Sequence, residues 1–110
     1  KRRCSRDLAQ MVAIACLCAE HTVLGSLHHE VGDPNQDCTL AYTKPYQYTV
    51  LGVFDGHGPA GQLAAELAKT TALSALTEET IEMAEAPEEA LRQIFEMIAA
   101  AADEATWSQQ

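Results

Sequence analysis

The sequence predicts an α+β fold, in which antiparallel strands are flanked by helices. Three observations support this prediction. Stretches rich in β-branched and aromatic residues lie in the first half of the chain and are separated by Gly, Pro and Asp, a pattern typical of short strands and turns. Apolar residues recur at helical spacing in the second half. Alanines accompany the leucines there, which permits close packing of a helix on a sheet.

The first segment, residues 5–19, predicts a short amphipathic helix, with Ser5 as a plausible N-cap. We therefore divide the chain into an N-terminal helix or leader, residues 1–21, and one domain, residues 22–110. A secretory signal is the alternative for the leader. Asp7 and Gln10 interrupt its apolar run, which is also too short to span a bilayer, so we expect no membrane association.

Three strands are expected after the leader. Residues 22–28 predict the first, and residues 37–43 and 46–54 predict the second and third, with Pro45 as the break between them. If the last two strands form a hairpin, their antiparallel pairing brings the flanking acidic residues, Asp37 and Asp55, to neighbouring strand ends.

Two helices are expected to follow. Pro59 precedes the first and Pro87 opens the second. The first helix is expected to bury leucines 63, 67, 73 and 76. The second is expected to bury a stripe formed by Leu91, Ile94, Phe95, Ile98 and Ala102.

Residues 50–61 form the stretch in which chemistry is expected. Residues 50–54 carry no charge and predict a mostly buried strand, which ends in Asp55. Gly56 and Gly58 on either side of His57 allow a sharp turn and leave backbone oxygens uncovered. A rigidly held carboxylate beside bare carbonyl groups suits Mg²⁺ or Mn²⁺, which prefer oxygen ligands.

The same glycines also satisfy a dinucleotide-binding pattern, Gly-x-Gly-x-x-Gly, at residues 56–61. A dinucleotide fold requires a further hydrophobic strand after the helix. Residues 77–89 are instead acidic and helical in composition. The cation site is therefore the favoured interpretation.

The motif Gly-Val-Phe-Asp-Gly-His-Gly-Pro, residues 52–59, closely resembles the signature of the metal-dependent protein phosphatase 2C family. Pro-Asn-Gln-Asp, residues 34–37, resembles that family's first acidic motif in its plant-like form. The resemblance implies that residues 22–110 are the N-terminal portion of such a catalytic domain, in a partial phosphatase 2C-like fold. It implies a serine/threonine phosphatase that uses two Mg²⁺ or Mn²⁺ ions in the complete domain and acts on phosphoserine or phosphothreonine proteins.

The resemblance also implies a role for each matching residue. Asp55 corresponds to the aspartate that bridges two cations, Gly56 to the glycine whose carbonyl completes one cation's shell, and Asp37 to the first acidic ligand. A water acidified by the two cations would attack phosphorus. His57 corresponds to the histidine proposed to protonate the leaving oxygen. From the residues alone, Asp37 as a turn residue and His57 as a turn histidine remain alternatives.

Two positions depart from the family pattern: Gln36 stands where many members have glutamate, and Gly32 stands where many have a basic residue that binds phosphate. The family's other metal-binding aspartates lie in a region that would follow Gln110. We therefore expect these 110 residues to be an incomplete and inactive portion of the enzyme. The alternative is a non-catalytic phosphatase-like protein that acts through protein–protein contacts. Uncovered sheet edges and an uncovered helix face also predict self-association.

Charge and cysteine content limit the remaining possibilities. The net charge of −9 argues against nucleic acid binding. The four cysteines lack zinc-ribbon spacing, and reduced thiols favour a cytoplasmic or nuclear protein. A zinc site formed by His21, His28, His29 and Cys38 is the weaker alternative, because the spacing of these residues is irregular.

Overall fold

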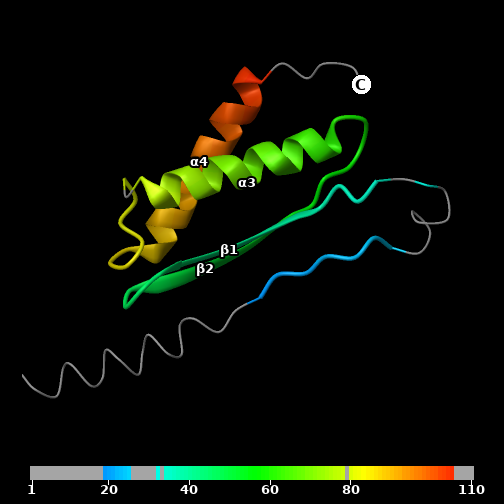
Figure 1. Ribbon diagram of the computed structural model, residues 1–110. Helices are drawn as coiled ribbons and strands as arrows, with labels where there is room; N and C mark the ends of the chain where they lie inside the picture. The colour runs from blue at the N-terminus through cyan, green and yellow to red at the C-terminus, as the bar shows by residue number, and fades with distance from the viewer. Residues whose placement is uncertain (1–18, 26–31, 33, 79, 106–110) are drawn as a thin grey trace, which may run out of the picture.

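The computed structural model describes residues 19–25, 32, 34–78 and 80–105. They form two strands and two helices, in the order β1 (Cys38–Lys44), β2 (Tyr48–Phe54), α3 (Gly61–Thr77) and α4 (Pro87–Glu104). The strands form an antiparallel hairpin, α3 lies along one face of it, and α4 crosses α3 (Figure 1). The predicted α+β class is therefore confirmed.

The hairpin is closed by a tight turn. β1 and β2 pair from Cys38 opposite Phe54 to Lys44 opposite Tyr48. In the turn between them, the N–H of Gln47 donates to the carbonyl of Lys44 at 3.0 Å. Tyr46 occupies the left-handed region with φ of 69°, in a turn that begins with Pro45. The third strand therefore begins at Tyr48 and not at residue 46.

The two helices cover one face of this hairpin (Figure 1). The inward side chains Leu40, Tyr42, Val50 and Phe54 belong to the core or pack against it. On the outward face, Leu51 and Val53 are 68% and 75% exposed. The prediction that residues 50–54 are mostly buried is therefore wrong for these two residues, because successive side chains of a strand point to opposite faces and the helices cover one face.

The core lies between the sheet and the two helices. Its buried residues are Leu40, Ala72, Ala75, Leu76, Met83, Ala90 and Ile94. Alanine at two of the α3 positions lets the helix approach its neighbours closely.

The predicted core stripes are only partly correct. Leu63 of α3 and Leu91 of α4 are exposed, and Phe95 is 69% exposed. The buried line of α4 runs instead through Ala90 and Ile94, with Ile98 packed beside it. A residue next to Ile94 in sequence lies about 100° around a helix from it. Because α4 packs mainly on α3, only a narrow line of its residues is buried, and Phe95 lies outside that line.

Helix α4 is supported at its exposed N-terminal turns by charged side chains. Glu88 and Glu89 lie in the first turn, where negative charge is favourable, after Pro87. The guanidinium of Arg92 donates hydrogen bonds to Glu89 and Glu96. Hydrogen bonds from Arg92, and then from Gln93, lower the pKa of Glu89 to about 2. These contacts are fully exposed, so they add little to stability.

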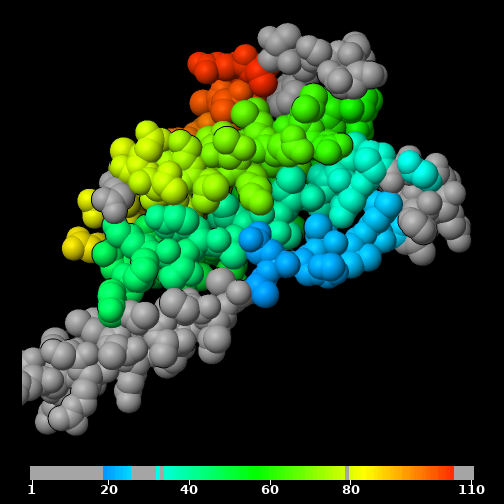
Figure 2. Space-filling model, in the orientation of Figure 1, coloured from blue at the N-terminus to red at the C-terminus, as the bar shows by residue number. Residues whose placement is uncertain are grey.

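Residues 19–25 form neither helix nor strand, so the predicted strand 22–28 is wrong for residues 22–25. Residues 26–28 of that strand lie outside the described residues, as do residues 5–18 of the predicted helix. The segment 19–25 runs beside the hairpin (Figures 1 and 2). The Thr39 hydroxyl donates to Glu20 at 2.8 Å, and the Asn35 amide donates to Thr22 at 3.3 Å. Side-chain hydrogen bonds therefore attach this segment.

None of the helices in the described part of the chain has the length and apolar character needed to cross a membrane.

Truncation of two leucines on α3 tests the position of the core. We expect Leu76→Ala to lower the free energy of unfolding by about 2–5 kcal/mol, because Leu76 is 1% exposed and its removal leaves a cavity. We expect Leu63→Ala, the matched control, to change it by about 0.5 kcal/mol or less, since Leu63 is 40% exposed. Urea unfolding followed by circular dichroism measures both, and equal losses would contradict this packing.

Candidate metal centre

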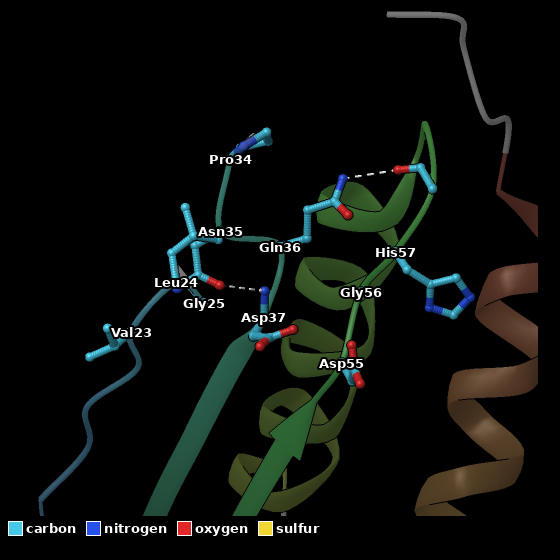
Figure 3. A pocket seen from close by; sticks show the side chains of 11 residues that line it. Val23, Leu24, Gly25, Pro34, Asn35, Gln36, Asp37, Asp55, Gly56 and His57 are labelled. Atoms are coloured by element: carbon cyan, nitrogen blue, oxygen red, sulfur yellow. Dashed lines mark hydrogen bonds between the residues drawn. The ribbon is translucent and has the colours of Figure 1, made fainter. Parts of the chain in front are cut away.

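The register of the hairpin brings together the two acidic residues singled out from the sequence. Asp37 directly precedes Cys38, Asp55 directly follows Phe54, and Cys38 is paired with Phe54. The two aspartates therefore lie at the same open end of the hairpin, as predicted, and Figure 3 shows them at the ends of the neighbouring strands. Asp37 is half-buried and Asp55 is exposed.

An open pocket of ≈430 Å³ lies at this end of the hairpin. Three segments surround it: the attached N-terminal segment, the stretch before β1 and the loop after β2. Its lining residues are Val23, Leu24, Gly25, Pro34, Asn35, Gln36, Asp37, Asp55, Gly56, His57 and Gly58. Both sequence motifs thus contribute to one pocket.

Asn35, rather than Asp37, caps the turn before β1. The backbone N–H of Asp37 donates to the side-chain oxygen of Asn35 at 3.1 Å (Figure 3). This is an Asx turn, in which a side chain two residues upstream bonds the backbone. The carboxylate of Asp37 has no hydrogen-bond partner among the described residues. The geometry thus disfavours the interpretation of Asp37 as a capping residue and leaves its oxygens available to a ligand.

Gly56 lies where two backbone segments meet. A Cβ atom at this position would meet the carbonyl oxygens of Gly61 and Gln36, the second at 2.5 Å. No side chain can be placed there without moving backbone, so a glycine is required for the loop to approach β1 this closely.

The side chain of Gln36 connects the two motifs. This role is not predicted from the sequence, where Gln36 stands out only as a departure from the glutamate that many family members have at this position. Its side-chain amide donates to the carbonyl of Gly58 at 2.9 Å (Figure 3). Its side-chain oxygen would lie 2.8 Å from a Cβ atom on Gly61, so the amide group also packs on the first residue of α3. The sequence gives one indication of this role: residue 36 carries an amide, whereas many members of the phosphatase 2C family, which the motifs resemble, have a carboxylate there.

His57 lines the pocket but does not join the two carboxylates. In the view of Figure 3, its imidazole points to the side of the loop away from Asp37. The side chain is exposed, and its ring makes no hydrogen bond within the described residues. An imidazole so placed is open to solvent or to a substrate, and no backbone hydrogen bond of the kind expected for a turn histidine is present in this part of the chain.

The oxygen donors of the pocket suit a hard divalent cation in type but supply only part of a coordination shell. The carboxylates of Asp37 and Asp55 and the carbonyl of Gly56 are ligands that Mg²⁺ and Mn²⁺ accept, with water in the other positions. Within the described residues, no group of three or more His, Cys, Asp or Glu side chains is arranged to hold a metal ion. Described residues that line the pocket include no Lys or Arg to bind phosphate.

The sequence also suggests two alternative sites, a zinc site and a dinucleotide site. The zinc site receives no support from His21 and Cys38, which belong to no such group, and His28 and His29 lie outside the described residues. The dinucleotide site is contradicted by the fold, because the described residues 80–86 contain no strand and α3 is followed by α4. A dinucleotide fold needs a parallel strand at that place.

The chain matches no family model, no curated protein and no solved structure.

Substitution of two glycines tests the close approach of the loop. We expect Gly56→Ala to lower the free energy of unfolding by about 1–3 kcal/mol, because the added methyl group forces the backbone of Gln36 and Gly61 apart. Gly52→Ala is the control, since its Cβ would make only ordinary contacts at 3.6–3.7 Å, and we expect a change within about 0.5 kcal/mol. Thermal unfolding compares the two variants, and a neutral Gly56→Ala would contradict the described approach.

Proposed function

We propose that this chain contributes to a metal-dependent serine/threonine protein phosphatase with a partial phosphatase 2C-like fold. The supporting observation is that the two acidic motifs, which are separate in sequence, contribute Asp37 and Asp55 to one pocket at one end of the hairpin. Two carboxylates and a glycine in the lining of one pocket favour a cation that activates water over a site for an organic cofactor.

In this proposal the chain's own groups hold and orient the reactants. Asp37, Asp55 and the carbonyl of Gly56 would bind Mg²⁺ or Mn²⁺, and the Asx turn at Asn35 fixes the backbone of Asp37. When bound, a pair of such cations supplies an acidified water as nucleophile for a phosphate ester. His57 would give a proton to the departing serine or threonine oxygen, a role available to an imidazole that faces solvent.

The proposed substrate is a protein carrying phosphoserine or phosphothreonine, and the proposed compartment is the cytoplasm or nucleus. Nucleic acid is not a proposed partner, since the net charge of −9 opposes binding to a phosphate backbone. The pocket supplies two carboxylates, so we expect cation binding by these 110 residues but little or no turnover by them alone.

Titration with Mn²⁺ tests the cation site, with free Mn²⁺ followed by electron paramagnetic resonance at pH 7. We expect the wild-type chain to bind Mn²⁺ and Asp55→Asn to weaken binding at least about tenfold, because a ligand is lost and even second-shell changes weaken metal sites by 10–100-fold. Asp103→Asn is the control, since it removes the same charge from α4 outside the pocket lining, and we expect an unchanged affinity.

The same variants are then incubated with a phosphothreonine peptide and Mn²⁺. Any hydrolysis should require Mn²⁺ and be lost in Asp55→Asn. A wild-type chain that does not bind Mn²⁺, or hydrolysis that Asp55→Asn leaves intact, would contradict the proposed function.

A second candidate function, a non-catalytic protein that acts through protein contacts, is favoured by the outward face of the hairpin. This face consists of Thr39, Ala41, Thr43, Thr49, Leu51 and Val53. None of these six side chains is charged, although the chain carries a net charge of −9. One charged residue from outside the hairpin, Glu20, contacts this face, where it accepts a hydrogen bond from Thr39. The proposed occupant of this face is a second copy of the chain, because contact through an uncharged surface limits the repulsion between two chains that each carry a net charge of −9.

Light scattering at several protein concentrations tests this self-association. We expect the average mass of the wild-type chain to rise above the 11.9 kDa of one copy as concentration increases. Leu51→Lys should keep the mass at that of one copy, because it places a charge on the outward face. Gln62→Lys, which adds the same charge at an exposed position of α3, should behave like the wild type. A compact monomer at all concentrations would exclude this candidate.

A further inference from the structure

Gln36 is the described residue whose side chain bonds one acidic motif to the other. It lies between Asn35, which caps the turn, and Asp37, which lines the pocket. Its amide donates across 22 positions of sequence to the carbonyl of Gly58. That carbonyl also accepts the N–H of Gly61 at 3.1 Å. Gly58 is thereby tied both to the stretch before β1 and to the first residue of α3.

The backbone around Gln36 makes a second contact with the loop. The carbonyl oxygen of Gln36 lies against Gly56, where a Cβ atom would meet it at 2.5 Å. The side chain of Gln36 reaches Gly58 and packs on Gly61. One residue thus contacts two glycines of the loop, Gly56 and Gly58, and the first residue of α3, Gly61. A movement of this loop would change the position of the Gly56 carbonyl and the separation of the two carboxylates.

We propose that Gln36 is a positioning residue for the cation site, which holds the loop of residues 55–58 against residues 35–37 so that the oxygen donors share one pocket before a cation arrives. The role of this contact in cation binding rests on the proposed function, whereas the contact itself can be tested without metal. Organised donors bind a cation more tightly because the protein does not have to order the loop on binding.

The contact requires a donor at this position. A glutamine amide offers an N–H to the Gly58 carbonyl, whereas an ionised glutamate would place oxygen against oxygen. A protonated glutamic acid regains a donor. Gln36→Glu is therefore expected to loosen the loop at pH 7 and to restore it as the pH falls to about 4, near the ordinary pKa of glutamic acid. Gln36→Met keeps a similar side-chain length and removes the donor at every pH.

Two measurements test the proposal. The first records backbone amide signals and hydrogen exchange of residues 57, 58 and 61 by NMR without metal, at pH 7 and pH 4. The wild type is measured at both pH values as the reference, because the ionisable side chains of Asp37, Asp55 and His57 line the same pocket. The second is Mn²⁺ affinity at pH 7. Gln62→Met, an exposed change on α3 outside the pocket lining, is the control for both.

We expect Gln36→Met to speed amide exchange at Gly61 and to weaken Mn²⁺ binding about tenfold or more, as loss of a second-shell partner does. The thermal midpoint should change little, since the hydrogen bond is exposed. Gln36→Glu should give loop signals like those of Gln36→Met at pH 7 and like those of the wild type at pH 4. This rescue distinguishes positioning from a merely structural role.

The proposal is overturned if Gln36→Met has wild-type exchange and wild-type Mn²⁺ affinity, or if the Gln36→Glu loop signals follow those of the wild type at both pH values. A wild-type chain without Mn²⁺ affinity overturns the proposed function and, with it, the purpose assigned to Gln36. The metal-free NMR comparison then still decides whether Gln36 holds the loop.

Discussion

The antiparallel register of the hairpin is the constraint on which the candidate site depends. Because Cys38 is opposite Phe54, the residues just outside this pair, Asp37 and Asp55, must share one end of the sheet. Each additional contact refines this arrangement: Asn35 caps the backbone of Asp37, and Gln36 reaches Gly58. A shift of one residue would turn every side chain of a strand to the other face.

The hairpin is held by packing on one face, and this explains both its stability and its exposed surface. Leu40 of β1 joins the buried residues of α3 and α4, including Ala75 and Leu76. Small residues on α3, Ala72 and Ala75, allow the helix to approach its neighbours closely beside Leu76. The helices leave the outward face uncovered, with Leu51 and Val53 in solvent. The hairpin thus carries the pocket at one end and an uncharged surface on its outward face, and these two features support the two candidate functions.

The loop after β2 combines an acidic residue with three nearby glycines for steric reasons that differ at each position. Gly56 is required by the close approach of two carbonyl oxygens, and Gly58 by its φ of 81°. Gly61 leaves room for the amide of Gln36. In the dinucleotide interpretation the same glycines would cradle a pyrophosphate. The antiparallel hairpin and the helix that follows α3 exclude that use, since the required parallel strand does not follow α3.

Local signals in the sequence predict the hairpin, the two helices after it and the position of Asp37 and Asp55 at one end of the hairpin. These signals are the strand alternation, the break at Pro45 and the proline that opens α4. Which apolar residues are buried depends instead on how the helices pack on each other and on the sheet. The burial of Ala90 in place of Leu91 and the exposure of Phe95 depend on where α3 crosses α4, which no local pattern specifies. The contact of Gln36 with Gly58 likewise joins residues 22 positions apart. A long-range hydrogen bond of a single side chain leaves no periodic signal in sequence, so only the folded chain reveals it.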